Sequence, residues 1–145
     1  GGKLNPHLDY SIHPMLKMQR KLNLIIYLCK DWQDEYGGHF GLYAPDSDTN
    51  RSGNLVKEIS VGFNKAVLFD TTQNSWHGLT KQVNCPTNQY RKSLAIYYFT
   101  TPPENVDTRS RALFSPTEEQ RNDNTITELI EKRADFNKSK EVYIG

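Results

Sequence analysis

The residues with the clearest chemical potential are a histidine and an aspartate near the start of the chain, His7 and Asp9. In an extended segment, residues i and i+2 point to the same face, so an imidazole and a carboxylate project side by side. A histidine from another strand would complete a 2-His-1-carboxylate triad, which leaves coordination positions open and suits non-haem Fe(II). The competing interpretation is a solvated histidine beside a solvated aspartate, because His-x-Asp alone is a common chance pattern.

A second group of chemically suggestive residues follows later in the chain. His77 comes after a predicted strand, and Arg91 and Ser93 open the apolar segment 91–100 and share one of its faces. A guanidinium at the mouth of an apolar strand costs free energy unless it pairs, and its planar fork matches a carboxylate. The Ser93 hydroxyl can bond the same carboxylate. The alternative is an arginine whose charged end reaches solvent.

Tyr27 is the third element of this pattern. The segment 21–28 alternates, with Leu22, Leu24, Ile26 and Leu28 on one face and Asn23, Ile25 and Tyr27 on the other. A mixed face of this kind is typical of a strand that lines a pocket, where the tyrosine hydroxyl can contact an anionic ligand. The alternative is a half-buried core tyrosine.

The elements that must position these residues are short strands. Apolar alternation and turn signals predict strands at 21–28, 39–43, 55–61, 65–71, 76–79 and 91–100, with loops at 44–54 and 81–89. Many short strands at regular spacing favour an all-β sandwich or barrel.

The composition changes after residue 100. Thr101-Pro102-Pro103 ends the last strand, and we expect 101–115 to form an extended arm. Capping boxes are predicted at 115–118, with Pro116 as the first helical residue, and at 125–128. Apolar spacing predicts a helix near 125–136, which we expect to pack on the sheet rather than bind a partner.

Composition limits the class of protein. The chain has 145 residues, so we expect a single domain, 1–145, with a β core at 1–100 followed by the arm and helix. Its 18 Lys and Arg against 17 Asp and Glu argue against nucleic-acid binding by bulk charge. No segment approaches the roughly 20 apolar residues that cross a bilayer, and no signal peptide is visible. Two cysteines, Cys29 and Cys85, favour free thiols in a reducing compartment, so a cytoplasmic location is expected.

The order of these motifs resembles a known family. His7-x-Asp9, RKLNLIIYLCKDW at 20–32, Gly37-Gly38, KAVLFD at 65–70, His77-Gly78 and Arg91-x-Ser93 follow one another as in the Fe(II)/2-oxoglutarate-dependent oxygenases. Within that family they are most similar to the prolyl-4-hydroxylase-like branch, which includes the oxygen-sensing prolyl hydroxylases. The similarity is greatest at Ile26–Trp32 followed by the glycine pair. The resemblance covers roughly residues 5–100.

The resemblance implies a fold and a set of roles. The family fold is a double-stranded β-helix (jelly roll), here with a C-terminal helix. His7, Asp9 and His77 match the iron ligands. Arg91 matches the residue that pairs with the distal carboxylate of 2-oxoglutarate, with Ser93 and Tyr27 beside it. The implied reaction uses O2 to hydroxylate a C–H bond and converts 2-oxoglutarate to succinate, with ascorbate as a candidate reductant.

The resemblance also leaves points open. The family usually has helices and a further strand before His-x-Asp, so we expect the chain to lack an N-terminal part. The 79–90 loop is longer than in the oxygen-sensing relatives, which weakens the expectation of a prolyl or other peptidyl substrate against a small molecule. The alternatives are a non-catalytic jelly-roll binding or scaffold module with a vestigial iron site, and a cupin-like metal enzyme, which would not explain Arg91-x-Ser93. The sequence does not indicate an oligomeric state.

Overall fold

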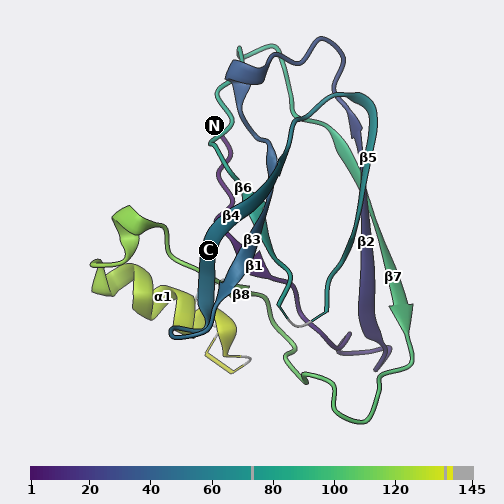
Figure 1. Ribbon diagram of the computed structural model, residues 1–145, viewed down its shortest axis with the longest axis vertical. Coiled ribbons are helices and arrows are strands. Elements are labelled where there is room, and N and C mark those ends of the chain that lie inside the picture. The colour runs from purple at the N-terminus through teal and green to yellow at the C-terminus, as the bar shows by residue number, and fades with distance from the viewer. Residues whose placement is uncertain (73, 136, 139–145) are drawn as a thin grey trace.

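Two antiparallel sheets face each other in the computed structural model, which describes residues 1–72, 74–135 and 137–138 (Figure 1). One sheet has five strands in the order β4-β3-β6-β1-β8, and the other has three in the order β5-β2-β7. The strands are β1 (His7–Leu8), β2 (Gln19–Leu28), β3 (Phe40–Asp46), β4 (Arg51–Ile59), β5 (Phe63–Asp70), β6 (Trp76–Leu79), β7 (Ser93–Thr100) and β8 (Leu113–Phe114). The short helices η1 (Asp34–Tyr36) and η2 (Glu118–Gln120) and the α-helix α1 (Asn124–Ala134) complete the described elements. The predicted all-β jelly roll with a C-terminal helix is confirmed.

Strand β2 is the centre of the three-stranded sheet and turns its mixed face inward. Asn23 and Tyr27 are buried, whereas Leu28, on the apolar face, is 40% exposed. Tyr27 packs in the main core with Phe40 and Phe69. The apolar side chains opposite the outer face of β2 are also exposed: Leu68 on β5 and Leu94, Ile96 and Tyr98 on β7. The face with polar residues is therefore the one that encloses the interior of the sandwich.

Strand β1 is only two residues long and lies between two partners. It pairs with β6, with His7 opposite His77, and with β8, with His7 opposite Phe114. The predicted extended arm at 101–115 therefore ends in a strand that covers the outer edge of β1. The pairing explains how a two-residue strand can hold its place in the sheet.

The predicted loop at 44–54 is wrong. Strand β3 continues to Asp46 and β4 begins at Arg51, so the turn is confined to residues 47–50. The Asp46 carboxylate accepts hydrogen bonds from the Asp48 amide and the Thr49 hydroxyl, and Asn50 adopts a φ of 50°. These few turn residues reverse the chain by themselves, so the polar residues around them remain in strands. The strand predicted at 55–61 accordingly spans 51–59.

The predicted capping boxes are also corrected. Thr117, not Ser115, caps η2, and its box partner is Gln120. Ser115 is buried instead, where its hydroxyl accepts a hydrogen bond from the Ser52 amide. Helix α1 is capped by Asp123, whose carboxylate accepts from the Thr125 and Ile126 amides, so the box predicted at 125–128 is not used.

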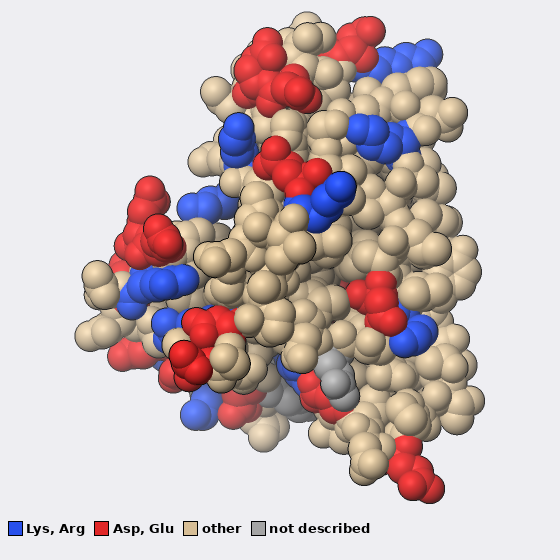
Figure 2. Space-filling view, in the orientation of Figure 1, with Lys and Arg blue, Asp and Glu red and all other residues tan. Residues whose placement is uncertain are grey.

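Helix α1 lies against β8 at the left of Figure 1 and has no buried residue among those described. It ends at Ala134, and residue 136, the predicted end, lies outside the described residues. No described helix is long and apolar enough to cross a membrane. In Figure 2, Lys and Arg side chains are scattered among acidic ones, with uncharged surface between them.

Gly78 provides a test of the contact between β6 and the segment before β1. A Cβ at this position would lie 2.8 Å from the Pro6 nitrogen and 2.9 Å from the Asn5 carbonyl carbon, both main-chain atoms that cannot turn aside. We expect Gly78→Ala to lower the free energy of unfolding by about 1–3 kcal/mol, measured by urea denaturation, because of this overpacking. Gly62→Ala is the matched control, since its Cβ would meet nothing closer than 3.7 Å. Equal losses in the two variants would contradict the close contact.

Candidate metal centre

Three residues predicted from the sequence converge at one point between the sheets. The ligand atoms of His7, Asp9 and His77 all lie within 4.8 Å of one another. His7 Nε2 is 3.8 Å from Asp9 Oδ1, and His77 Nε2 is 3.5 Å from Asp9 Oδ2. The pairing of β1 with β6 places the two imidazoles together, with ring centroids 4.4 Å apart. Asp9 follows directly after β1 and turns to the same side.

The far side of each imidazole is held by a main-chain carbonyl. His7 Nδ1 lies 3.0 Å from the Asn5 oxygen, and His77 Nδ1 lies 2.7 Å from the Ser75 oxygen. A carbonyl only accepts, so Nδ1 carries the proton in each ring and Nε2 presents its lone pair to the centre. Partners of this kind orient metal-binding histidines and raise their basicity as ligands. Phe114, Phe40 and Phe69 pack against the two rings.

The Asp9 side chain is 14% exposed, and its carboxylate is incompletely paired. Its Oδ2 has no hydrogen-bond partner among the described residues, and its Oδ1 lies 3.2 Å from Nη1 of Arg20. Arg20 is itself 4% exposed, and its Cζ lies 4.8 Å from the ring centroid of Tyr10 and 3.6 Å from that of Tyr97. A buried carboxylate oxygen without a partner costs free energy, and a cation at this point would satisfy it. Two imidazole nitrogens and one carboxylate fit Fe(II) and leave room for further ligands.

Burial keeps both histidines neutral. Desolvation, with a smaller contribution from the neighbouring His7, lowers the pKa of His77 from 6.5 to about 4 against the opposing charge of Asp9. Desolvation also lowers the pKa of His7, against the opposing effects of the hydrogen bond to Asn5 and the charge of Asp9. Because metals bind neutral imidazole, the two rings are in the ligating form at neutral pH.

Arg91, Tyr27 and Ser93 form a second group. Arg91 Nη2 is 3.4 Å from the Tyr27 hydroxyl, and the guanidinium lies over the Tyr27 ring, 5.0 Å from its centroid. Ser93 begins β7 directly opposite Tyr27 in the ladder, and Arg91 precedes that strand rather than opening it. Tyr27 has no exposed surface, and its burial raises the pKa of the phenol. The structure therefore joins the Arg91 guanidinium to the Tyr27 hydroxyl, whereas Ser93 is an exposed ladder partner of Tyr27.

Gly38, the second glycine of the pair, makes room for Arg91. Arg91 Nε donates to the Gly38 carbonyl at 2.8 Å. A Cβ on Gly38 would lie 2.8 Å from Arg91 Cδ and 2.9 Å from Val83 Cγ2, and the φ of Gly38 is +69°. Only glycine combines this backbone conformation with so close an approach. A hollow of about 420 Å³ beside Arg91 is also lined by Gly2, Val83 and Tyr90.

Sequence reasoning misses the residues that support the triad. It assigns Arg20 to no site, although a charged residue at the start of an apolar strand is a usable signal. Asn23 is buried on the inner face of β2 with its Oδ1 unpaired among the described residues. Arg109, far along the chain, donates to the Asp9 carbonyl, and no local pattern could have indicated it.

The two remaining histidines lie outside both groups. His39 is 5% exposed, with its ring nitrogens 3.7 Å from Asp34 Oδ1 and 3.5 Å from Glu58 Oε1. His13 accepts hydrogen bonds from the Met15 and Leu16 amides in a turn. Cys29 and Cys85 are free thiols, as expected.

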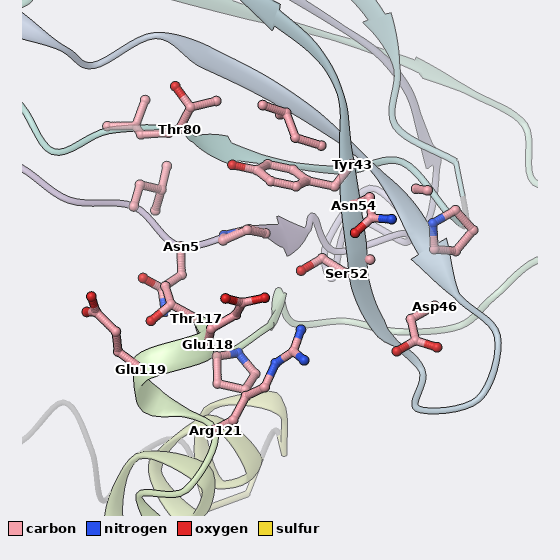
Figure 3. Close-up of a pocket in the computed structure, with 18 of the residues that line it drawn as sticks. Asn5, Tyr43, Asp46, Ser52, Asn54, Thr80, Thr117, Glu118, Glu119 and Arg121 are labelled. Atoms are coloured by element: carbon pink, nitrogen blue, oxygen red, sulfur yellow. The ribbon is translucent and has the colours of Figure 1, made fainter.

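A groove of about 870 Å³ lies away from the triad, between the β3–β4 hairpin and η2 (Figure 3). Its walls are polar and include Asn5, Tyr43, Asn54, Thr117, Glu118 and Arg121. None of the six predicted site residues lines it. Size alone therefore does not identify the chemical site in this fold.

The lowered histidine pKa values predict a pH dependence of stability for the metal-free protein. Between pH 6.5 and about 4, the unfolded chain binds a proton at His77 that the folded chain excludes. The free energy of unfolding should therefore be highest above pH 6.5 and fall by up to about 3 kcal/mol as the pH drops to 4. Urea denaturation in a chelator at several pH values measures this fall.

His77→Gln should reduce the pH dependence, because glutamine does not titrate. His13→Gln, which changes a histidine outside the cluster, should retain it. A pH dependence that is the same in both variants would contradict the assignment to His77.

Comparison with known proteins agrees with the geometry. A search among curated proteins returned no significant match. A family profile described as the 2OG-Fe(II) oxygenase superfamily matches residues 1–99, which include all of the triad and the Arg91 group. The match and the converging His-Asp-His cluster together show that this chain belongs to the 2OG-Fe(II) oxygenase superfamily.

Proposed function

We propose that this chain hydroxylates a C–H bond of a prolyl or other peptidyl substrate, with Fe(II) and 2-oxoglutarate as cofactor and cosubstrate. The observation that carries the proposal is the convergence of two imidazole Nε2 atoms and an unpaired buried carboxylate oxygen within 4.8 Å. Family membership supplies the reaction class.

His7, Asp9 and His77 would hold the iron. The carbonyls of Asn5 and Ser75 fix the two imidazole rings with Nε2 inward, so the ligands need little reorganisation when the metal binds. Arg20, with Nη1 3.2 Å from Asp9 Oδ1, orients the Asp9 carboxylate. When bound, iron and 2-oxoglutarate supply the oxidation, in which O2 hydroxylates the substrate C–H bond and 2-oxoglutarate becomes succinate and CO2.

Arg91 would anchor the distal carboxylate of 2-oxoglutarate. Its Nε is already used on Gly38, which fixes the plane of the guanidinium and leaves Nη groups for the ligand. The Tyr27 hydroxyl accepts from Arg91 Nη2 and would donate to the same carboxylate, and the hydroxyl of Ser93, the ladder partner of Tyr27, would add a second donor. The inner face of β2 links the two groups, because Asn23 and Tyr27 both project from it into the interior.

The peptidyl substrate rests on the resemblance of Ile26–Trp32 and Gly37-Gly38 to the prolyl-hydroxylase branch. Incubation with proline-containing peptides, with free proline as the comparison, tests it. Succinate release that depends on peptide, together with the gain of one oxygen atom by the peptide in mass spectrometry, would support this class. Turnover of the free amino acid alone would contradict it.

Anaerobic titration of the metal-free chain with Fe(II) and 2-oxoglutarate is the direct test. We expect a saturable visible charge-transfer band from the chelate. Arg91→Ala should weaken 2-oxoglutarate binding by more than about 2 kcal/mol, or roughly 30-fold, because the distal carboxylate loses its charged partner. Lys92→Ala, an exposed neighbouring cation, is the control and should bind as the wild type does.

The absence of a band in the folded wild-type protein would overturn the proposal. It would favour a jelly-roll binding module with a vestigial site. If Arg91→Ala bound 2-oxoglutarate as tightly as the wild type, another residue would have to bind the distal carboxylate. The assignment of the metal ligands would still hold.

Gly38→Ala separates the two parts of the site. The added methyl group would stand 2.8 Å from Arg91 Cδ and displace that side chain, and it would strain a backbone φ of +69°. We expect 2-oxoglutarate affinity to fall about tenfold, at a cost of about 1.4 kcal/mol, with Co(II) affinity unchanged. Calorimetric titration of each ligand measures both, with Gly62→Ala as control. If Gly38→Ala lost 2-oxoglutarate and Co(II) affinity equally, Gly38 would not act on the Arg91 side chain alone.

A further inference from the structure

The segment that follows the β core returns to the metal-binding segment and lies along it. Residues 107–115, here termed the strap, include β8, which pairs with β1. At one end of this contact the Ser115 amide donates to the Pro6 carbonyl at 2.8 Å. At the other end the Ser11 and Ile12 amides donate to the Arg109 carbonyl at 2.8 and 3.3 Å. The strap therefore contacts the chain on both sides of His7 and Asp9.

The Arg109 side chain makes the contact nearest to a ligand. Its Nε and Nη2 both donate to the Asp9 carbonyl oxygen, at 3.3 and 3.1 Å. Its side chain is 17% exposed, so these charge-assisted hydrogen bonds are partly shielded from water. Because β1 ends at Leu8, Asp9 lies beyond the part of the ladder that would otherwise hold its main chain.

Asp107 prepares Arg109 for this role. Its Oδ2 accepts from Nη1 of Arg109 at 2.5 Å, and its Oδ1 accepts from the Arg109 amide at 2.8 Å. The guanidinium thus has one edge on Asp107 and the other on the Asp9 carbonyl. Because Asp107 fixes the planar guanidinium of Arg109, its hydrogen bonds to the Asp9 carbonyl restrict rotation of that peptide unit.

We infer that Arg109 is a positioning residue for the metal-binding carboxylate, acting through the main chain of Asp9. The inference rests on the proposed function, because it takes Asp9 as an iron ligand. Arg109 does not contact the ligand atoms. It limits rotation of the Asp9 peptide unit, which sets the direction in which the carboxylate leaves the chain. Supporting groups of this kind typically change metal affinity 10–100-fold.

Co(II) binding by the full chain tests this role without turnover. Isothermal titration calorimetry should give a dissociation constant for Arg109→Gln at least about tenfold above that of the wild type. Arg109→Lys keeps the charge but loses the forked geometry of the guanidinium. Its Co(II) affinity should therefore lie between those of Arg109→Gln and the wild type. The visible Co(II) spectrum at saturation should change in Arg109→Gln, because the carboxylate binds in an altered position.

Arg121→Gln is the matched control, since Arg121 is an exposed arginine of the same C-terminal region. Its affinity and spectrum should equal those of the wild type. Hydrogen exchange at the Ser11 and Ile12 amides distinguishes loss of the Arg109 side chain from detachment of the strap. Both amides donate to the Arg109 main-chain carbonyl, which Arg109→Gln retains. Protection that persists while Co(II) affinity falls supports the side-chain role.

Two results would overturn the inference while leaving the proposed function standing. One is wild-type Co(II) affinity and spectrum in Arg109→Gln. The other is loss of amide protection together with affinity, which would assign the effect to detachment of the whole strap. If Arg109→Gln does not fold, wild-type affinity in both Arg109→Lys and Asp107→Asn would also overturn it. Failure of the wild type to bind Co(II) would instead overturn the proposed function, and this inference with it.

Discussion

The antiparallel pairing of β1 with β6 is the constraint on which the rest of this structure depends. It places His7 opposite His77, two residues far apart in the sequence, and orients both imidazoles to the interior. Because β1 contributes only two residues, the ladder by itself holds it weakly. The strap on its outer edge, the close approach of Gly78 to the segment before it and the hydrogen bonds of Arg109 supply the remaining restraint.

The second constraint is electrostatic. A carboxylate largely removed from water is costly unless its charge is balanced. Arg20 balances Asp9, and the rings of Tyr10 and Tyr97 in turn cover the guanidinium. Burial then keeps the histidines neutral, which is the form that a metal ion requires. The arrangement that costs stability in the absence of a metal ion thus prepares these side chains to bind a cation.

One strand connects the metal centre to the carboxylate-binding group. Strand β2 buries Arg20, Asn23 and Tyr27 along the interior of the sandwich. Simple alternation would put Arg20 on the opposite face from Asn23 and Tyr27. An irregularity in the pairing of β2 with β7, between Arg20 and Leu22, shifts the register and turns Arg20 inward. This local departure explains why the alternation predicted from the sequence located Tyr27 but not Arg20.

Local patterns in the sequence predict the fold class, most of the strands, and the residue types and order of the candidate site. Alternation is a local property, and His-x-Asp, the glycine pair and Arg-x-Ser are short motifs, so each can be read without knowing the fold. Tertiary structure alone decided how the 44–54 region continues in strands and which residue caps each helix. It also decided that Arg20 and Arg109 support Asp9. Those features depend on register shifts and on contacts between distant segments, such as the 100 positions that separate Arg109 from Asp9. No local pattern encodes such contacts.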